Sequence, residues 1–352
     1  MDEITITSDR AILDVPGIKY VYADCAASCP PLPCAVEAFT KWAYANPNSA
    51  HSLGREARTE LEHARETIAE CINAEPSEIA FTPSATEACR IAINVMNIGW
   101  CSPYEHKAVW EHARFINIWG LSDTNAYAHM LANNETGEIY VGKVKELSQK
   151  YSVFTDATAA VGQIPVDVKD LGVHALAAGG HKFGAFPGIG FLYINGGVKD
   201  EDVFPGTPPV ALAVAMAEAL QYRTTNMPMA TSYLSHRVGV LEARIESFIP
   251  DAHINCQDKD RLPNILSVRF DGVNARELLS MLDARGLYAS AGAACTADAD
   301  TPSRTLLASG LTEEQALSTI RLSFCPETTA DEFSFVADAL RRSVSQLRKL
   351  TE

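Results

Sequence analysis

Residues 179–194 read GGHKFGAFPGIGFLYI, and this stretch decides most about the fold. Lys182 lies among closely spaced glycines, and residues 189–194 form an apolar run that is typical of a buried strand. Glycine lets the backbone approach other groups closely, so we expect a crowded turn directly before that strand.

The segments before this stretch alternate between strand and helix patterns. Apolar runs at 79–81 and 151–155 predict buried strands. Apolar residues recur at helical spacing over 55–72, and 85–96 is a second helical stretch. Such alternation predicts an α/β fold with a mainly parallel sheet.

The pattern changes after Pro208 and Pro209. We expect two helices, at 210–222 and 230–248, and then a second lobe that begins near residue 240. Its expected strands are 264–270, 287–290 and 319–324, and its expected helices are 275–285 and 331–348. These patterns predict a large domain at 15–240 and a smaller α+β domain formed by 1–14 and 241–352.

Composition excludes several classes of protein. The 352 residues are 47% hydrophobic and 21% charged, as in ordinary globular chains. No apolar run is long enough for a membrane helix, and the start Met1-Asp2-Glu3 is unlike a secretory signal, so we expect a cytoplasmic protein without a membrane partner. The net charge of -15 disfavours nucleic-acid binding and favours a small-molecule substrate.

The cysteines point to a reducing compartment. There are nine, scattered along the chain, which suits reduced thiols better than a disulfide framework. Cys25, Cys29 and Cys34 cluster, but they lack the paired spacing of a zinc site, so we predict no metal.

Two short motifs follow the predicted strands. Ser84-Ala85-Thr86-Glu87 has the spacing of a capping box, and the helix start that it marks can bind phosphate or can simply be capped. Asp156 ends the run 151–155 at the edge of the sheet where ligands usually bind. Its carboxylate suits a pyridinium nitrogen, although turn aspartates are common there.

Three further side chains have more than one interpretation. Lys182 suits an imine with an aldehyde cofactor, although most lysines are only solvated. His106, in EHKAV, suits a place against a flat cofactor ring or at a helix start. Cys295, in SAGAACT, suits a reactive thiol in an accessible loop or a structural cysteine.

Together, nine motifs in order carry a resemblance that spans nearly the whole chain. They read YADCAASCP, NPNSAHSLGREA, FTPSATEA, EHKAV, ANNETG, DATAAVGQIPVDV, GGHKFGAFPGIGFLYI, SAGAACT and STIRLSF. The chain resembles the cysteine desulfurases of the NifS/IscS type, within the class V aminotransferase-like branch of the fold type I pyridoxal 5'-phosphate (PLP) enzymes. The resemblance implies a large domain with a mainly parallel, seven-stranded type of sheet.

The resemblance also implies roles for individual residues. Lys182 is expected to form the imine with PLP, Asp156 to pair with the ring nitrogen, and His106 to stack on the ring and move protons. The expected phosphate-binding residues are Ala85, Thr86, His181 and, toward the partner subunit of a homodimer, Thr207.

The substrate-binding residues follow from the same resemblance. Asn134 is expected near the cofactor oxygen and the carboxylate of L-cysteine, and Arg321 is expected to grip that carboxylate. Cys295 is expected to take the sulfur as a persulfide, with release of alanine. A sulfur-acceptor protein, such as an iron-sulfur scaffold, is the implied partner.

Three departures from the family pattern concern cofactor contacts. Ala159 stands where the family usually has a glutamine that bonds the cofactor's phenolic oxygen. Gly179 stands where a phosphate-binding serine is common, and the segment before Gly206 and Thr207 is contracted. Three alternatives therefore stay open: selenocysteine lyase, cysteine-sulfinate desulfinase, and a weakly catalytic scaffold or sulfur-relay protein.

Overall fold

The computed structural model describes residues 20–113, 125–198, 203, 206–292 and 301–351. These residues form two compact units, each described here by itself. The first unit contains Cys29–Ala132 and Tyr140–Met227, and the second contains 20–28, Asn133–Ile139 and 228–351. A domain boundary near residue 240 stays a prediction.

The first unit is built on a six-stranded sheet in the order β2-β7-β6-β5-β4-β3. The strands are β2 (Ile79–Thr82), β3 (Trp100–Cys101), β4 (Ala126–Ala128), β5 (Ser152–Asp156), β6 (Ala175–Gly179) and β7 (Gly190–Ile194). β3 to β6 pair in parallel, whereas β7 runs antiparallel to both β2 and β6. The predicted α/β class with a mainly parallel sheet is confirmed.

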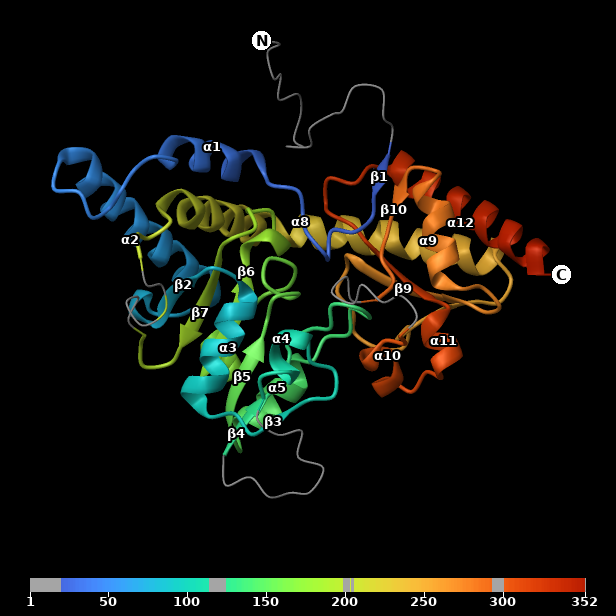
Figure 1. The fold of residues 1–352 in the computed structure, drawn as a ribbon, viewed down its shortest axis with the longest axis horizontal. Coiled ribbons are helices and arrows are strands. Elements are labelled where there is room, and N and C mark those ends of the chain that lie inside the picture. The colour runs from blue at the N-terminus through green and yellow to red at the C-terminus, as the bar shows by residue number, and fades with distance from the viewer. Residues whose placement is uncertain (1–19, 114–124, 199–202, 204–205, 293–300, 352) are drawn as a thin grey trace, which may run out of the picture. The chain divides into compact units, whose positions relative to one another are not determined.

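Helices cover this sheet because its strands are apolar on both faces. α3 (Ala85–Met96) packs across β5, β6 and β7 (Figure 1). Its small residues Ala88 and Ala92 are fully buried. The other helices of this unit are α1 (Pro33–Trp42), α2 (Ser52–Ile72), α4 (Lys107–Trp110), α5 (Val141–Ser148), α6 (Val168–Leu171) and the 3₁₀ turns η1 (Pro76–Glu78) and η2 (Gly180–Lys182).

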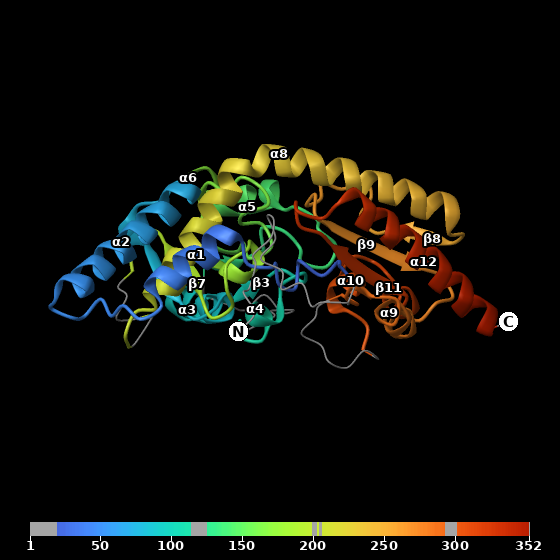
Figure 2. The ribbon, with the colours of Figure 1, turned by 90° about the horizontal axis from the view of Figure 1, so that it is seen from above.

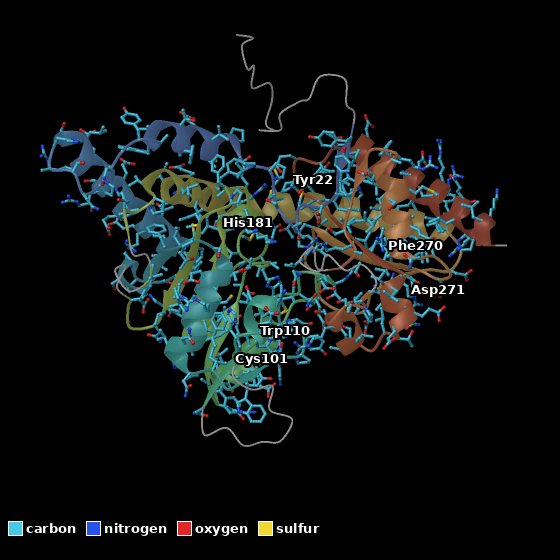
Figure 3. The ribbon with its side chains drawn as sticks, in the orientation of Figure 1. Tyr22, Cys101, Trp110, His181, Phe270 and Asp271 are labelled. Atoms are coloured by element: carbon cyan, nitrogen blue, oxygen red, sulfur yellow. The ribbon has the colours of Figure 1, made fainter. Side chains whose placement is uncertain are left out.

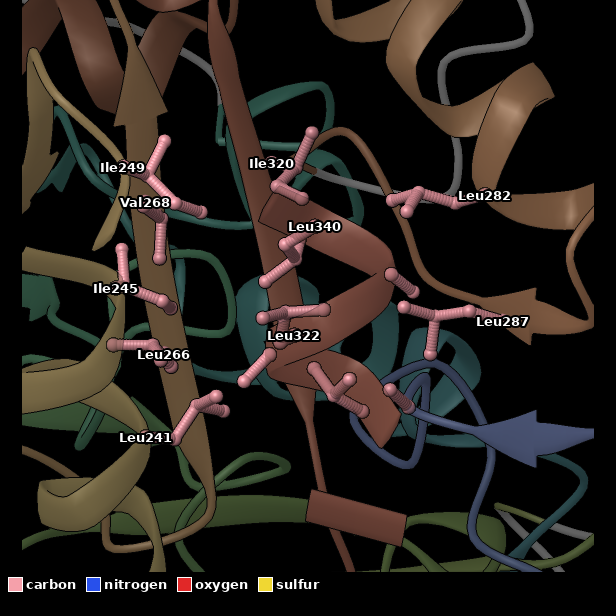
Figure 4. Close-up of a cluster of buried hydrophobic side chains, with 14 of the residues drawn as sticks. Leu241, Ile245, Ile249, Leu266, Val268, Leu282, Leu287, Ile320, Leu322 and Leu340 are labelled. Atoms are coloured by element: carbon pink, nitrogen blue, oxygen red, sulfur yellow. The ribbon is translucent and has the colours of Figure 1, made fainter. Parts of the chain in front are cut away.

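The second unit has its own sheets and core. β8 (Ala252–Ile254), β9 (Ile265–Phe270) and β11 (Thr319–Ser323) form an antiparallel sheet, and β1 (Val21–Tyr22) pairs in parallel with β10 (Leu287–Tyr288). Its helices are α9 (Ala275–Asp283), α10 (Arg304–Ala308), α11 (Glu313–Leu317) and α12 (Ala330–Thr351). α12 packs against α9, and Figure 2 shows both helices in the second unit. Figure 4 shows the core, where Leu340 meets Ile320 and Leu322.

One long helix replaces the two helices expected after residue 209. α8 (Val210–Phe248) is continuous for 39 residues, although Pro228 lies inside it and lacks an N–H to donate to the preceding turn. The prediction of a break was wrong because Arg223 and Met227, one turn apart on the same face, are both buried and hold that turn in place.

Across the residues that the structure describes, no helix combines the length and apolar character that a bilayer span requires.

Candidate active site

The first turn of α3 presents backbone amides that no carbonyl of the helix itself can satisfy. Ser84 caps this helix, with its Oγ accepting a hydrogen bond from Glu87 N at 3.1 Å. The Glu87 carboxylate accepts from Arg90 Nε at 2.8 Å, in place of the reciprocal bond of the predicted capping box. The amides of Ala85 and Thr86 have no carbonyl within their own helix, which makes this end suited to an anion.

Two glycines bring the sheet close to this helix start. A Cβ at Gly179 would lie 3.2 Å from Ala85 Cβ, and a Cβ at Gly190 would lie 3.0 Å from Ala85 N. The ends of β6 and β7 therefore form a cradle around the first turn of α3. A side chain larger than glycine at position 179 would press against Ala85.

Lys182 follows the cradle directly. It lies in η2, three residues after the end of β6, and it is half-buried. Burial, followed by the charge of Lys182, lowers the pKa of His181 to about 4, so this imidazole is neutral at neutral pH. His181 is labelled in Figure 3, and its carbonyl oxygen accepts from Cys29 N at 2.7 Å.

Asp156 lies at the carboxyl end of β5, beside β6. Its side chain is buried, and Oδ1 accepts from Thr158 N at 3.0 Å. Burial, followed by the Asp156 carboxylate, raises the pKa of the Cys89 thiol of α3 well above its usual range. The thiol therefore keeps its proton and hydrogen-bonds to Asp156.

His106 is the N-cap residue of α4. Its Nδ1 accepts a hydrogen bond from Ala108 N at 3.1 Å, so a neutral ring carries its proton on Nε2. The preceding residue, Glu105, is buried, and the sequence analysis missed it. Besides burial, Asp156 raises the pKa of its carboxyl group and His106 lowers it, as expected of side chains that lie in one region of the first unit.

A second group of predicted residues lies in the second unit. Arg321, on β11, is 2% exposed and donates from Nη2 to Asp24 Oδ1 at 2.7 Å. Its Nη1 donates to the main-chain oxygen of Asn134 at 2.9 Å. The predicted substrate-binding residues Asn134 and Arg321 are therefore in contact, through a backbone carbonyl.

Two further predicted residues are Thr207 and Cys295. Thr207 is exposed in the short segment before α8. Cys295 lies outside the described residues. Of the residues that flank its loop, Ser303 donates from Oγ to Glu135 Oε2 at 2.5 Å, and a Cβ at Gly292 would lie 2.8 Å from that same oxygen.

Arg223 is another residue that the sequence analysis missed. It reaches from α8 to the turn after Lys182, where its Nε donates to Phe183 O at 3.2 Å. Its Nη2 lies 3.4 Å from Cys29 Sγ. The buried guanidinium of Arg223 therefore stabilises the turn that contains Lys182 by hydrogen-bonding to the next residue's carbonyl.

The comparisons with known proteins agree with this arrangement. The aminotransferase class-V family matches residues 21–109, 117–202 and 199–336. The chain therefore belongs to the aminotransferase class-V family.

Several individual relatives are cysteine desulfurases. The chain is 31% identical to cysteine desulfurase IscS of Dictyoglomus turgidum, with 95% of this chain and 96% of that protein covered. It is 30% identical to the IscS-like cysteine desulfurase of Mycobacterium tuberculosis, with 93% and 97% covered. A solved NifS-like protein superposes with a TM-score of 0.82 at 27% identity, over 94% of this chain and all of that one. The predicted resemblance and the fold type I assignment are confirmed.

Membership of this family implies PLP, and the first unit fits that cofactor. The amides at the start of α3 suit a phosphate, the Lys182 amine suits an aldehyde, and the Asp156 carboxylate suits a ring nitrogen. Thr158 Oγ1 is buried without a hydrogen-bond partner in the described part of the chain, which leaves one polar atom for a ligand.

Proposed function

We propose that this protein is a PLP-dependent cysteine desulfurase, which converts L-cysteine to L-alanine and transfers the sulfane sulfur to Cys295. The observation that carries this proposal is the placement of three groups at one edge of the same sheet. The phosphate-type cradle at Ala85, the amine of Lys182 and the carboxylate of Asp156 all follow carboxyl ends of strands in the same sheet.

PLP, when bound, supplies an aldehyde that condenses with amines and a ring that withdraws electrons from the substrate's α-carbon. Ala85, Thr86 and His181 would hold the phosphate, and Thr207 would reach the phosphate of the partner subunit in a homodimer. Asp156 would keep the ring nitrogen protonated. Because the pKa of His181 is lowered, this residue offers a neutral hydrogen-bonding group instead of a second charge.

Lys182 and His106 are the proposed proton carriers. The Lys182 amine would hold or pass on a proton when it is free, and His106 Nε2 would give or take one, because Nδ1 is occupied by Ala108 N. Arg223 fixes the backbone next to Lys182, which keeps the amine in one place.

Arg321 and Asn134 are the proposed substrate-binding residues. A guanidinium recognises a carboxylate through directed, charge-assisted hydrogen bonds. Its Nε has no hydrogen-bond partner among the described residues, although Asp24 and the Asn134 carbonyl occupy the two terminal nitrogens. This N–H is therefore available to an additional acceptor.

The sulfur step balances without an external oxidant. The carbon–sulfur bond of L-cysteine breaks and a sulfur–sulfur bond forms on the thiol of Cys295, so cysteine plus thiol gives alanine plus persulfide. The β-carbon of the substrate is reduced by two electrons, and the sulfur atoms are oxidised by two. A sulfur-acceptor protein, such as an iron-sulfur scaffold, then takes the sulfur, and the proposed setting is the cytoplasm.

Product analysis tests this proposal against its alternatives. The purified protein is incubated with L-cysteine, L-selenocysteine or L-cysteine sulfinate, and alanine is quantified with each substrate. We expect the highest kcat/KM with L-cysteine. Higher values with selenocysteine or the sulfinate would assign the chain to the lyase or desulfinase reaction, and no alanine from any of them would favour a scaffold or sulfur-relay role.

A further inference from the structure

Glu105 is a buried carboxyl group that the proposed mechanism does not use. The residue is 3% exposed, and its Oε1 accepts from Ser102 Oγ and from Met130 N, each at 2.6 Å. Ser102 precedes the His106 turn, and Met130 follows β4. Glu105 therefore ties the backbone next to His106 to the end of β4, one strand away from Asp156.

The surroundings of the second oxygen of this carboxyl group indicate that Glu105 is uncharged. Glu105 Oε2 is buried, and it has no hydrogen-bond partner among the described residues. A charged carboxylate oxygen in such a place would lose its solvation without compensation. A proton on this oxygen removes the charge, while Oε1 still accepts both hydrogen bonds.

The neighbouring groups also favour the neutral acid. Asp156 from β5 is the second carboxyl group that acts on Glu105, and two nearby carboxyl groups do not easily ionise together. Cys89 from α3 and Tyr127 from β4 also interact electrostatically with Glu105. Burial raises the pKa of both side chains, so neither adds a charge at neutral pH. Among the described residues, His106 on the same turn is the basic group that acts on Glu105, and it acts in the opposite direction by lowering the pKa.

We propose that Glu105 is a positioning residue, which as an uncharged acid anchors the His106 turn to β4, one strand away from Asp156. This inference rests on the proposed function, because His106 and Asp156 take their roles from it. Burial, followed by the effect of Asp156, raises the pKa of Glu105 to about 8, which agrees with the geometry.

Infrared difference spectroscopy tests the charge state in the holoenzyme. The spectrum of wild type minus Glu105→Gln should contain the C=O stretch of a protonated carboxyl group at neutral pH. That stretch should give way to carboxylate bands above pH 8. Carboxylate bands alone at neutral pH would overturn the proposal. Glu146→Gln, an exposed acid on α5, is the matched control and should lose only carboxylate bands.

Kinetics test the anchoring role. Glu105→Ala removes the acceptor of two hydrogen bonds and should lower kcat at least about tenfold, because His106 is no longer held in place. Glu105→Gln keeps an acceptor oxygen and should recover most of kcat at neutral pH. Its kcat–pH profile should depart from that of wild type only where wild-type Glu105 ionises. An alanine variant with wild-type kcat would contradict the anchoring role.

The wild-type protein separates the two possible failures. If it binds no PLP and releases no alanine from L-cysteine, the proposed function fails. If it does both, but the glutamine and alanine variants match it at every pH, only the role of Glu105 fails. Circular dichroism and the wavelength of the bound cofactor's absorption establish that each variant is folded and loaded.

Discussion

Arg321 Nη2 donates to Asp24 Oδ1 at 2.7 Å, and this ion pair joins residues that are 297 positions apart. The guanidinium is nearly inaccessible, so without the aspartate it would be an uncompensated buried cation. Asp24 thus holds Arg321 in one orientation before any substrate binds. A substrate carboxylate at Arg321 would meet a guanidinium that is already fixed in place.

Removal of Arg321 should act mainly on substrate binding. A charge-assisted hydrogen bond contributes about 1.5–3 kcal/mol, so Arg321→Ala should raise the KM for L-cysteine by roughly one to two orders of magnitude. Arg269→Ala is the matched control, because Arg269 on β9 makes the same kind of pair with Asp271 at 2.7 Å. Steady-state kinetics of both variants measure the effect. An equal change in KM in both variants would mean that Arg321 does not bind the substrate.

Lys182 should carry the cofactor covalently. Borohydride reduction of the wild-type protein should fix a pyridoxyl group on the peptide that contains Lys182, as measured by mass spectrometry. Lys182→Ala should lose the yellow imine absorption and hold PLP as a free aldehyde. Lys145→Ala, a partly exposed lysine on α5 that pairs with Asp170, is the control and should remain yellow. A pyridoxyl group on a different lysine would refute the assignment.

The raised pKa of Glu105 should make stability depend on pH. Its ordinary pKa is 4.5 and its folded pKa is about 8, so between these values the folded state holds a proton that the unfolded state has released. Stability therefore falls as pH rises through this window, by about 1.4 kcal/mol per pH unit from this group, and levels off above it. Urea unfolding of Glu105→Gln should lack this decline, and parallel pH curves would show that Glu105 is not neutral in the folded protein.

Restoring the family's amide at position 159 should alter the bound cofactor. Ala159 is half-buried in the turn after Asp156, where a glutamine would add one hydrogen-bond donor. A donor favours the deprotonated form of an oxygen, so Ala159→Gln should lower the pH midpoint of the imine absorption by up to about one unit. Thr158→Val tests whether the hydroxyl of the adjacent Thr158 already donates a hydrogen bond to the cofactor's phenolic oxygen. An unchanged midpoint in Ala159→Gln would mean that residue 159 does not face the cofactor's phenolic oxygen.

Local sequence predicted the parts of this molecule that depend on local physics. The apolar run before Asp156 became β5, and the segment 85–96 became α3 with Ser84 as its cap. Because the carboxyl ends of parallel strands share one edge of a sheet, the motif that contains Lys182 could be expected near Asp156.

The residues that the sequence analysis missed act over long sequence separations. Arg223 lies 40 positions from Phe183 and 194 from Cys29, and Glu105 lies 25 positions from Met130. A charged side chain at helical spacing reads as a solvated one until the fold supplies its partners. Position 228 shows the same limit, because the burial of Arg223 and Met227 before the proline, invisible in the sequence, keeps α8 continuous.

The most direct test of the proposed function is a single turnover with L-cysteine in the absence of a reductant. Equal amounts of holoenzyme and L-cysteine are mixed and quenched, after which alanine is quantified and the peptide that contains Cys295 is weighed. We predict one alanine per active site and a Cys295 peptide heavier by one sulfur atom, while Cys295→Ser binds L-cysteine and forms neither product at the wild-type rate. Persulfide on another cysteine, or its formation at full rate in Cys295→Ser, would contradict the assignment of Cys295, and a turnover that yields no alanine would contradict the cysteine desulfurase activity itself.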